Sequence, residues 1–156
     1  MFAYPKRIKY PTDNQIEIWV LNRENLTGRE IAKRKKVSPA FVSKTLKRTN
    51  RLIKDLLENA ARMNKIKLDL MNEELGFARG MSHVFNVKAY LTFSPENGVN
   101  VWFEHKGECG SCEEFGHCRQ TLLLEFKERN IKVRNPTLQP TDLGELLFKK
   151  LEEMVK

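Results

Sequence analysis

The sequence predicts an α+β chain with an all-helical N-terminal half and a smaller α+β domain in its C-terminal half. Two observations carry this prediction. Apolar residues recur at helical spacing up to about residue 75, and after residue 83 they alternate with polar residues, as they do in strands. We therefore expect one domain over residues 1–75, a linker with glycines over residues 76–82, and a second domain over residues 83–156.

Two short helices are predicted at the start of the chain. Thr12 or Asp13 can cap the first one, because a short polar side chain at that position accepts a free backbone N–H. Thr27 and Glu30 have the spacing of a capping box, in which each side chain accepts the backbone N–H of the other residue. The second helix therefore begins after Thr27, and we expect it to end near Lys35.

A long connecting helix is predicted from Ser38 and Pro39 onward, since an N-cap serine followed by proline is a strong start signal. No helix breaker follows before Gly76. Apolar or small residues recur along this segment in steps of four and three: Val42, Leu46, Thr49, Ile53, Leu56, Ala60 and Met63. This heptad pattern leaves two interpretations open, a helix that packs on its own domain and a seam between two subunits of a dimer.

The C-terminal half begins with a predicted β-hairpin. Apolar residues alternate with polar ones on both arms, at Val87, Ala89, Leu91 and Phe93 and again at Val99, Val101 and Phe103. Asn97 and Gly98 lie between the arms and are typical of a tight turn. A cysteine-rich loop follows, and after it we expect a helix over about residues 118–129, a short strand over residues 131–133 and a last helix that starts at Thr141.

Charge is distributed unevenly between the two halves. The chain has 156 residues and a net charge of +8. Residues 1–70 contain 17 Lys and Arg against 7 Asp and Glu, whereas residues 71–156 contain 11 against 13. A basic half joined to a slightly acidic half indicates that only the first half meets a polyanion. The abundance of Lys and Glu is also common in proteins of thermophiles.

Composition also bears on location and redox environment. No apolar stretch is long enough to span a membrane, and residues 1–7 lack the apolar core of a secretory signal, which favours a cytoplasmic protein. The three cysteines, Cys109, Cys112 and Cys118, lie within ten positions of one another. An odd number so closely spaced argues against a disulfide framework and favours ligands to a metal.

Residues 26–32 and 37–46 together have the pattern of a helix-turn-helix. The first segment reads Leu-Thr-Gly-Arg-Glu-Ile-Ala, and the second reads Val-Ser-Pro-Ala-Phe-Val-Ser-Lys-Thr-Leu. Over about residues 12–57 the chain resembles the DNA-binding motif of LuxR-type regulators, of sigma factor region 4 and of the archaeal Tfx group. The resemblance implies a transcription regulator that places its third helix in the major groove of double-stranded DNA. The small core between the helices would consist of Ile31, Ala32, Val37, Val42 and Leu46.

The residues expected to contact DNA lie on the second and third helices. The outward surface of the third helix would hold Ala40, Phe41, Ser43, Lys44, Lys47, Arg48 and Arg51. Ser43, Lys44 and Lys47 suit base edges, and Ala40 or Phe41 can meet a thymine methyl group. Phosphate contacts are expected from Arg29, Lys33, Arg34, Lys35, Lys36, Arg51 and the Ser38 hydroxyl at the helix start. One such motif covers little DNA, so a homodimer is expected.

Potential metal ligands are concentrated in residues 105–118: His105, Cys109, Cys112, His117 and Cys118. The cysteine spacing is similar to the end of the iron–sulfur loop in endonuclease-three-type glycosylases, which implies an iron–sulfur cluster. The further cysteine of that loop is replaced here by Trp102, so His105, or alternatively His117, would complete the site. A structural zinc ion held by three cysteines and one histidine is the alternative, and a loop without metal is the third possibility.

These observations favour a DNA-binding transcription regulator that is not an enzyme. Its C-terminal domain would sense redox state, iron or a small ligand, with an iron–sulfur cluster as the expected cofactor. One alternative is a helix-turn-helix factor with a purely structural zinc site. Another is a nucleic-acid-modifying enzyme, although no acid–base motif organises the glutamates around the cysteine loop, which are Glu104, Glu108, Glu113 and Glu114.

Overall fold

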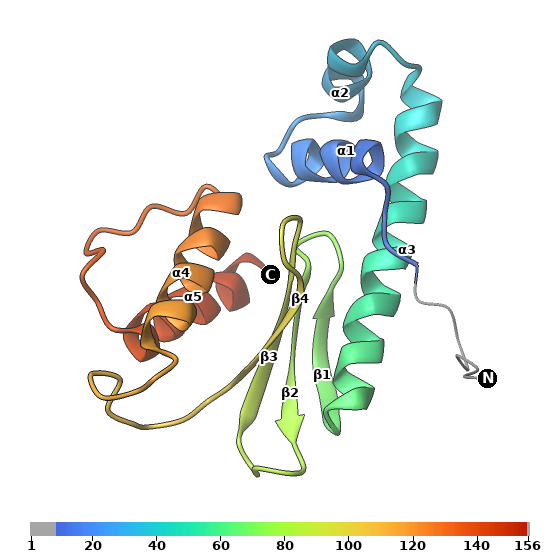
Figure 1. Cartoon of the computed structure of the whole chain (residues 1–156). Coiled ribbons are helices and arrows are strands. Elements are labelled where there is room, and N and C mark those ends of the chain that lie inside the picture. Colours follow the sequence, from blue (N-terminus) through green and yellow to red (C-terminus); the bar gives the residue numbers. More distant parts are fainter. Residues whose placement is uncertain (1–8, 156) are drawn as a thin grey trace, which may run out of the picture.

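The computed structural model describes residues 9–155 as five helices and one four-stranded sheet, which confirms the α+β class (Figure 1). The helices are α1 (Asp13–Arg23), α2 (Gly28–Lys35), α3 (Pro39–Met63), α4 (Phe115–Glu128) and α5 (Pro140–Met154). The strands are β1 (Ile66–Asn72), β2 (Phe77–Ser82), β3 (Lys88–Ser94) and β4 (Gly98–Phe103). No helix in this range is long and apolar enough to cross a membrane. Residues 1–8, on which the expected cytoplasmic location depends, lie outside the described range.

The four strands form an antiparallel meander in the order β1-β2-β3-β4. β2 lies so close to β1 that a Cβ at Gly80 would be 2.3 Å from the carbonyl oxygen of Lys67, so only glycine fits there. The turn between β3 and β4 ends at Gly98, where φ is +78°, a backbone conformation that glycine adopts without strain. The hairpin predicted at Asn97 and Gly98 is therefore confirmed.

Helices cover both faces of this sheet, with α3 on one side and α4 and α5 on the other (Figure 1). Ile53 and Leu57 of α3 lie in one buried cluster with Leu91 and Phe93 of β3. The opposite cluster is formed by Phe77 of β2 and by side chains of the last two helices, which are Leu122, Phe126, Leu143, Leu147, Phe148 and Leu151. Three layers with the sheet in the middle therefore form the body of the protein.

α1, α2 and the first turns of α3 form a three-helix unit with a small core of its own. Its buried residues are Ile18, Ile31, Ala32 and Val42, and the partly buried Leu21, Leu26, Val37 and Leu46 pack against them. The five core residues that the sequence predicts are all present, and Ile18 is added from α1. The predicted start signals are confirmed as well, since Thr12, Thr27 and Ser38 each accept a backbone N–H at the start of their helix.

The structure corrects the sequence prediction between residues 64 and 82. The predicted helix continues to Gly76, but α3 ends at Met63, where Asn64 Nδ2 donates to a carbonyl oxygen one turn earlier (2.9 Å). Residues 66–72 form β1, and residues 76–82, predicted as a linker, contain β2. The prediction is wrong here because two adjacent strands with short turns contain the same apolar residues that suggest a helix.

Smaller corrections concern the last third of the chain. α4 begins at Phe115, ahead of the predicted start near Cys118. Residues 131–133 belong to no strand, although their apolar and β-branched composition predicts one. α5 begins at Pro140, directly before the predicted start at Thr141.

The heptad stripe of α3 packs against the sheet of the same chain. Ile53 and Leu56 are buried between α3 and the sheet, and Ala60 packs against the same cluster. Met63, at the end of the stripe, is 74% exposed. The stripe from Ile53 to Ala60 therefore packs within the chain, partly against Leu91 and Phe93 of the predicted second domain, and it is not available as a seam between subunits.

Candidate functional site

The first turns of α3 present a polar and basic surface. The helix start is fixed by Ser38, whose Oγ accepts the backbone N–H of Phe41 (3.1 Å), and by Pro39 at the first helical position. Val42, Thr45 and Thr49 are buried on one face of the helix, so the opposite face points outward. Every residue predicted on the outward surface is exposed: Ala40, Phe41, Ser43, Lys44, Lys47, Arg48 and Arg51.

Basic side chains of α2 and the turn after it extend this surface. Those of Arg29, Lys33, Arg34 and Lys36 are exposed. Lys35 differs, because its Nζ forms an ion pair with Glu17 of α1 and its side chain is only 22% exposed. Lys35 therefore joins α2 to α1. Among the ion pairs of residues 9–155, none neutralises Lys33, Lys44 or Lys47.

The end of α1 anchors the three-helix unit to the C-terminal half. The guanidinium of Arg23 lies over the Trp19 ring, 4.4 Å from its centroid, and its NH2 donates to the carbonyl oxygen of Glu128 (2.8 Å). Glu128 is the last residue of α4. Burial, and next the neighbouring Arg129, lower the pKa of Arg23 to about 10. The guanidinium is thus held by packing and by one backbone carbonyl at the junction of the two halves.

A buried ion pair between Glu125 and Arg129 lies beside this anchor. Glu125 Oε1 also accepts hydrogen bonds from Thr92 Oγ1 (2.6 Å) and Asn100 Nδ2 (2.8 Å). Arg129 NH2 donates to the carbonyl oxygen of Gly76 (3.3 Å). Both charges are therefore compensated inside the fold, where a lone charge would be strongly unfavourable. The sequence gives no sign that this pair is buried, since charged residues are frequent along the whole chain.

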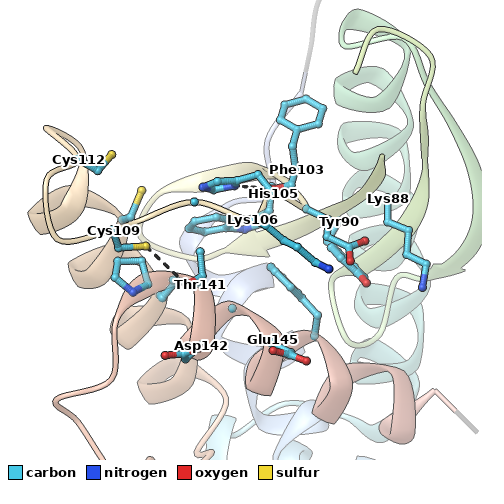
Figure 2. Close-up of a pocket in the computed structure, with 18 of the residues that line it drawn as sticks. Lys88, Tyr90, Phe103, His105, Lys106, Cys109, Cys112, Thr141, Asp142 and Glu145 are labelled. Atoms are coloured by element: carbon cyan, nitrogen blue, oxygen red, sulfur yellow. Dashed lines mark hydrogen bonds between the residues drawn. The ribbon is translucent and has the colours of Figure 1, made fainter. Parts of the chain in front are cut away.

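The cysteine loop differs in exposure from one thiol to the next. Cys109 is buried, and its S–H points toward Thr141 Oγ1 at 3.6 Å, whereas Cys112 is exposed and Cys118 is half-buried (Figure 2). Burial raises the pKa of the Cys118 thiol, and the next contributions come from Cys112, Glu114 and Cys109. Cys112 and Cys109 therefore lie close enough to Cys118 to disfavour its thiolate form.

The arrangement of these side chains does not form a metal site. Within residues 9–155, no group of three or more His, Cys, Asp or Glu side chains is placed to hold a metal ion. His105 and His117 are exposed, and His105 Nδ1 lies 3.1 Å from the carbonyl oxygen of Phe103. The loop would have to rearrange before either histidine joined the three cysteines. The iron–sulfur cluster and the zinc ion stay predictions.

A cavity of about 580 Å³ opens between the sheet, the cysteine loop and the last two helices (Figure 2). Tyr90 of β3, Trp102 of β4 and Phe148 of α5 form an aromatic wall, and the three cysteines line the cavity as well. The rings of Tyr90 and Phe148 are parallel and stacked, with centroids 4.3 Å apart. Sites for small molecules typically have volumes of roughly 300–1,000 Å³.

This cavity was not predicted from the sequence. Tyr90 and Trp102 occupy positions that alternate with the apolar residues of the hairpin, so they fall on the side expected to face solvent. That side is covered by α4 and α5 instead. Two large aromatic residues on the polar side of a hairpin indicate that this second face of the sheet is also covered.

The chain thus has two candidate sites, the basic surface of α2 and α3 and the cavity beside the cysteine loop. α4 lines the cavity at its first turns and contacts α1 of the three-helix unit at its end. Comparisons with known protein families, with curated proteins and with solved structures found no match to this chain.

Proposed function

We propose that this chain is a sequence-specific transcription regulator that binds double-stranded DNA through α1, α2 and α3 as a helix-turn-helix. The observation that carries the proposal is the outward surface of α3. It combines basic, hydroxyl and apolar side chains on a helix whose opposite face is fully packed. A solvated surface needs no such combination, whereas a helix in a major groove contacts bases with these side-chain types.

The roles of the two helices follow from their side chains. The start of α3 would enter the major groove, where Lys44 and Lys47 can donate to guanine and Phe41, 44% exposed, can meet a thymine methyl group. α2 would cross the backbone and contact phosphates through Lys33 and Arg34. α3 continues without a break into the body of the protein, so the groove-binding segment is rigidly connected to the sheet.

Selection of bound sequences from a library of random duplexes tests the proposal directly. The wild-type chain should enrich a defined sequence and bind it more tightly than an unrelated duplex in fluorescence anisotropy. Recovery of no preferred sequence, together with no binding to any duplex at low salt, would contradict the proposal.

Replacing Lys44 and Lys47 with alanine should weaken sequence preference. Each lost base contact is expected to cost about 1–3 kcal/mol on the selected duplex and much less on unrelated duplexes. Anisotropy titrations with both duplexes measure the difference. The matched control is Lys127→Ala with Lys150→Ala, which removes the same charge from exposed positions on α4 and α5. Equal losses on both duplexes would place these lysines on phosphates.

Replacing Lys33 and Arg34 with alanine should weaken binding uniformly across sequences. Each phosphate contact releases counterions, so the slope of log K against log salt concentration should become shallower by about 2 for the pair. Titrations at several salt concentrations give this slope. Lys35→Ala serves as the comparison, because Lys35 is paired with Glu17 and should change the slope least. An unchanged slope in the double variant would remove α2 from the interface.

We also propose that the protein binds DNA as a homodimer, since one helix-turn-helix contacts too few base pairs for tight binding. Apolar side chains remain exposed near the end of α3 and the turn after β2, at Met63, Met81, Val84 and Phe85. Backbone contacts join these segments, because the N–H of His83 donates to the carbonyl oxygen of Lys65 (3.1 Å). Sedimentation at tens of micromolar, an order of magnitude where weak interfaces form, tests the assembly.

A metal in the cysteine loop is a second proposal, favoured by the placement of Cys109, Cys112 and Cys118 around one cavity. An iron–sulfur cluster would make the C-terminal half a redox sensor, whereas a zinc ion would stabilise its fold. Protein purified without oxygen should then contain iron or zinc near one equivalent, and Cys112→Ser should lower that content by most of its value. Cys112 is exposed, so the variant should leave the core intact. Metal-free wild-type protein would contradict this proposal and leave the DNA-binding proposal intact.

A further inference from the structure

We propose that the cavity beside the cysteine loop binds an uncharged, planar aromatic small molecule, and that α4 transmits its occupancy to the three-helix unit. The effect on DNA rests on the proposed function, whereas the binding step does not.

Aromatic side chains favour a planar ligand. Phe148 stacks on Tyr90, and its ring centroid is 6.1 Å from that of Trp102, with the two rings tilted by 54°. Tyr90 and Trp102 are only partly buried, so part of each ring faces the cavity. A flat aromatic molecule that displaces water there gains apolar burial and ring contacts together.

The charges that line the cavity balance one another. Three lysines contribute positive charge and three carboxylates contribute negative charge: Lys88, Lys106, Lys149, Glu104, Asp142 and Glu145. A site with no net charge gives no advantage to an anion or a cation, and burial of a charged ligand without a fixed partner is unfavourable. The site therefore favours an uncharged molecule.

α4 connects this cavity to the three-helix unit. Phe115, Cys118 and Leu122, in its first turns, line the cavity. At its other end, the carbonyl oxygen of Glu128 accepts the hydrogen bond from Arg23 of α1. A helix of this length is about 21 Å long and moves as one rigid element. A ligand that displaces its first turns therefore also displaces the anchor of α1.

A chain of buried hydrogen bonds follows the same path. Trp102 Nε1, in the cavity wall, donates to Thr92 Oγ1 (3.1 Å). Thr92 Oγ1 donates to Glu125 Oε1 (2.6 Å), and Glu125 is paired with Arg129 beside Arg23. A shift of Trp102 on ligand binding thus reaches the junction through fixed polar contacts. If the junction has two states and the cavity binds the ligand more tightly in one of them, ligand binding shifts the population toward that state. The shift would then change the affinity for DNA.

The test of binding uses N-phenyl-1-naphthylamine, an uncharged aromatic amine that fluoresces in apolar surroundings. The full chain should show saturable fluorescence with one probe per chain. The anionic 8-anilinonaphthalene-1-sulfonate should bind more weakly. Absence of saturable binding by the uncharged probe, or tighter binding of the anion, would overturn the proposed ligand class.

Two variants locate the probe. Thr141→Phe places a ring in the wall beside Cys109 and should weaken probe binding at least about tenfold, because the cavity is partly filled. Gly144→Ala is the gentler variant; its Cβ would lie 3.5 Å from Phe148 and 4.0 Å from Leu122, so the helix accepts it while the cavity narrows. Met154→Ser, at an exposed apolar position at the end of α5 that does not line the cavity, is the control. Equal affinities for all four proteins would show that the probe binds outside the cavity.

The test of transmission compares probe affinity with and without the selected duplex. Coupling between the sites predicts a change in probe Kd of roughly 5–150-fold, equal to the change that the probe causes in DNA affinity. Thr92→Val, which removes the middle of the hydrogen-bond chain, should keep probe binding and abolish the change. Asn130→Gly removes the contact of Asn130 Nδ2 with Glu24 Oε1 (3.2 Å) at the junction and suits the backbone there, where φ is +54°, so it provides a second variant if Thr92→Val folds poorly.

The outcomes separate the two proposals. In one outcome the probe binds saturably and responds to the cavity variants, yet has the same Kd with and without bound duplex. That result would overturn the proposed transmission to DNA and support the proposed binding site. A protein that binds the probe as expected and binds no duplex would refute the proposed function alone. Loss of probe binding with normal DNA binding would refute the cavity proposal alone.

Discussion

Ile53→Asp should unfold the protein instead of releasing folded monomers. Ile53 is fully buried between α3 and the sheet, in the cluster that holds Leu57, Leu91 and Phe93. Removal of a buried isoleucine alone costs about 2–5 kcal/mol, and an unpaired carboxylate in the same place adds several kcal/mol more. The sum is comparable to the whole stability of a typical domain, about 5–15 kcal/mol. Circular dichroism and size-exclusion chromatography should show an unfolded or aggregated chain.

Lys54→Asp is the matched control, since it introduces the same side chain one position along α3 on the exposed face. Among the ion pairs of residues 9–155, Lys54 takes part in one, with Glu58 at 3.9 Å, and a surface pair of this kind contributes at most about 1 kcal/mol. The control should therefore melt close to wild type. A folded, monomeric Ile53→Asp protein, alongside a dimeric wild type, would restore the seam between subunits that the heptad pattern first suggested.

Local signals explain why the three-helix unit could be predicted closely. Thr27 with Glu30 and Ser38 with Pro39 specify helix starts through contacts within four residues, so no tertiary information is needed. The apolar positions of α2 and α3 then determine which side chains point outward. For this reason the candidate DNA surface was predicted residue by residue, with Lys35 as the exception because Glu17 lies in another helix.

The sheet could be predicted only in part. β3 and β4 flank an Asn-Gly turn and were found, but β1 and β2 were assigned to a helix and a linker. Gly76 and Gly80 suggest flexibility in sequence, yet each has a steric role: a Cβ at Gly76 would lie 3.0 Å from the Trp19 ring, and at Gly80 it would meet β1. Both requirements arise from residues distant in the chain, which a linear pattern does not contain.

The cavity could not be predicted for the same reason. Its walls come from β3, β4, the cysteine loop, α4 and α5, and only the folded topology brings them together. The cysteine spacing pointed to one segment of its wall, but ligand spacing in sequence says nothing about where the loop directs its thiols. Cys109 turns toward Thr141 and Cys112 toward solvent. The sequence therefore singled out a candidate segment but not the arrangement of its thiols.

Arg129→Met should destabilise the protein strongly while leaving the surface unchanged. The variant removes the partner of Glu125, which is fully buried, and leaves its charge facing only the hydrogen bonds from Thr92 and Asn100. Breaking a buried pair in this way costs about 3–5 kcal/mol. In a protein of this size that loss lowers Tm by roughly 6–20 °C. Thermal melts and urea titrations measure both quantities.

A double variant separates the lost charge compensation from the lost packing. Glu125→Gln keeps an oxygen that accepts from Thr92 and Asn100 and removes the charge, so Glu125→Gln with Arg129→Met should be more stable than Arg129→Met alone. Lys127→Met, at an exposed position on the same helix, controls for the substitution itself and should remain within about 0.5 kcal/mol of wild type. If Arg129→Met has the same melting temperature as Lys127→Met, the ion pair between Glu125 and Arg129 does not stabilise the junction. The hydrogen-bond chain from Trp102 to Arg23 then loses its structural basis. If the double variant recovers stability but the probe and the duplex no longer influence each other, the charge pair is retained for communication between the two halves.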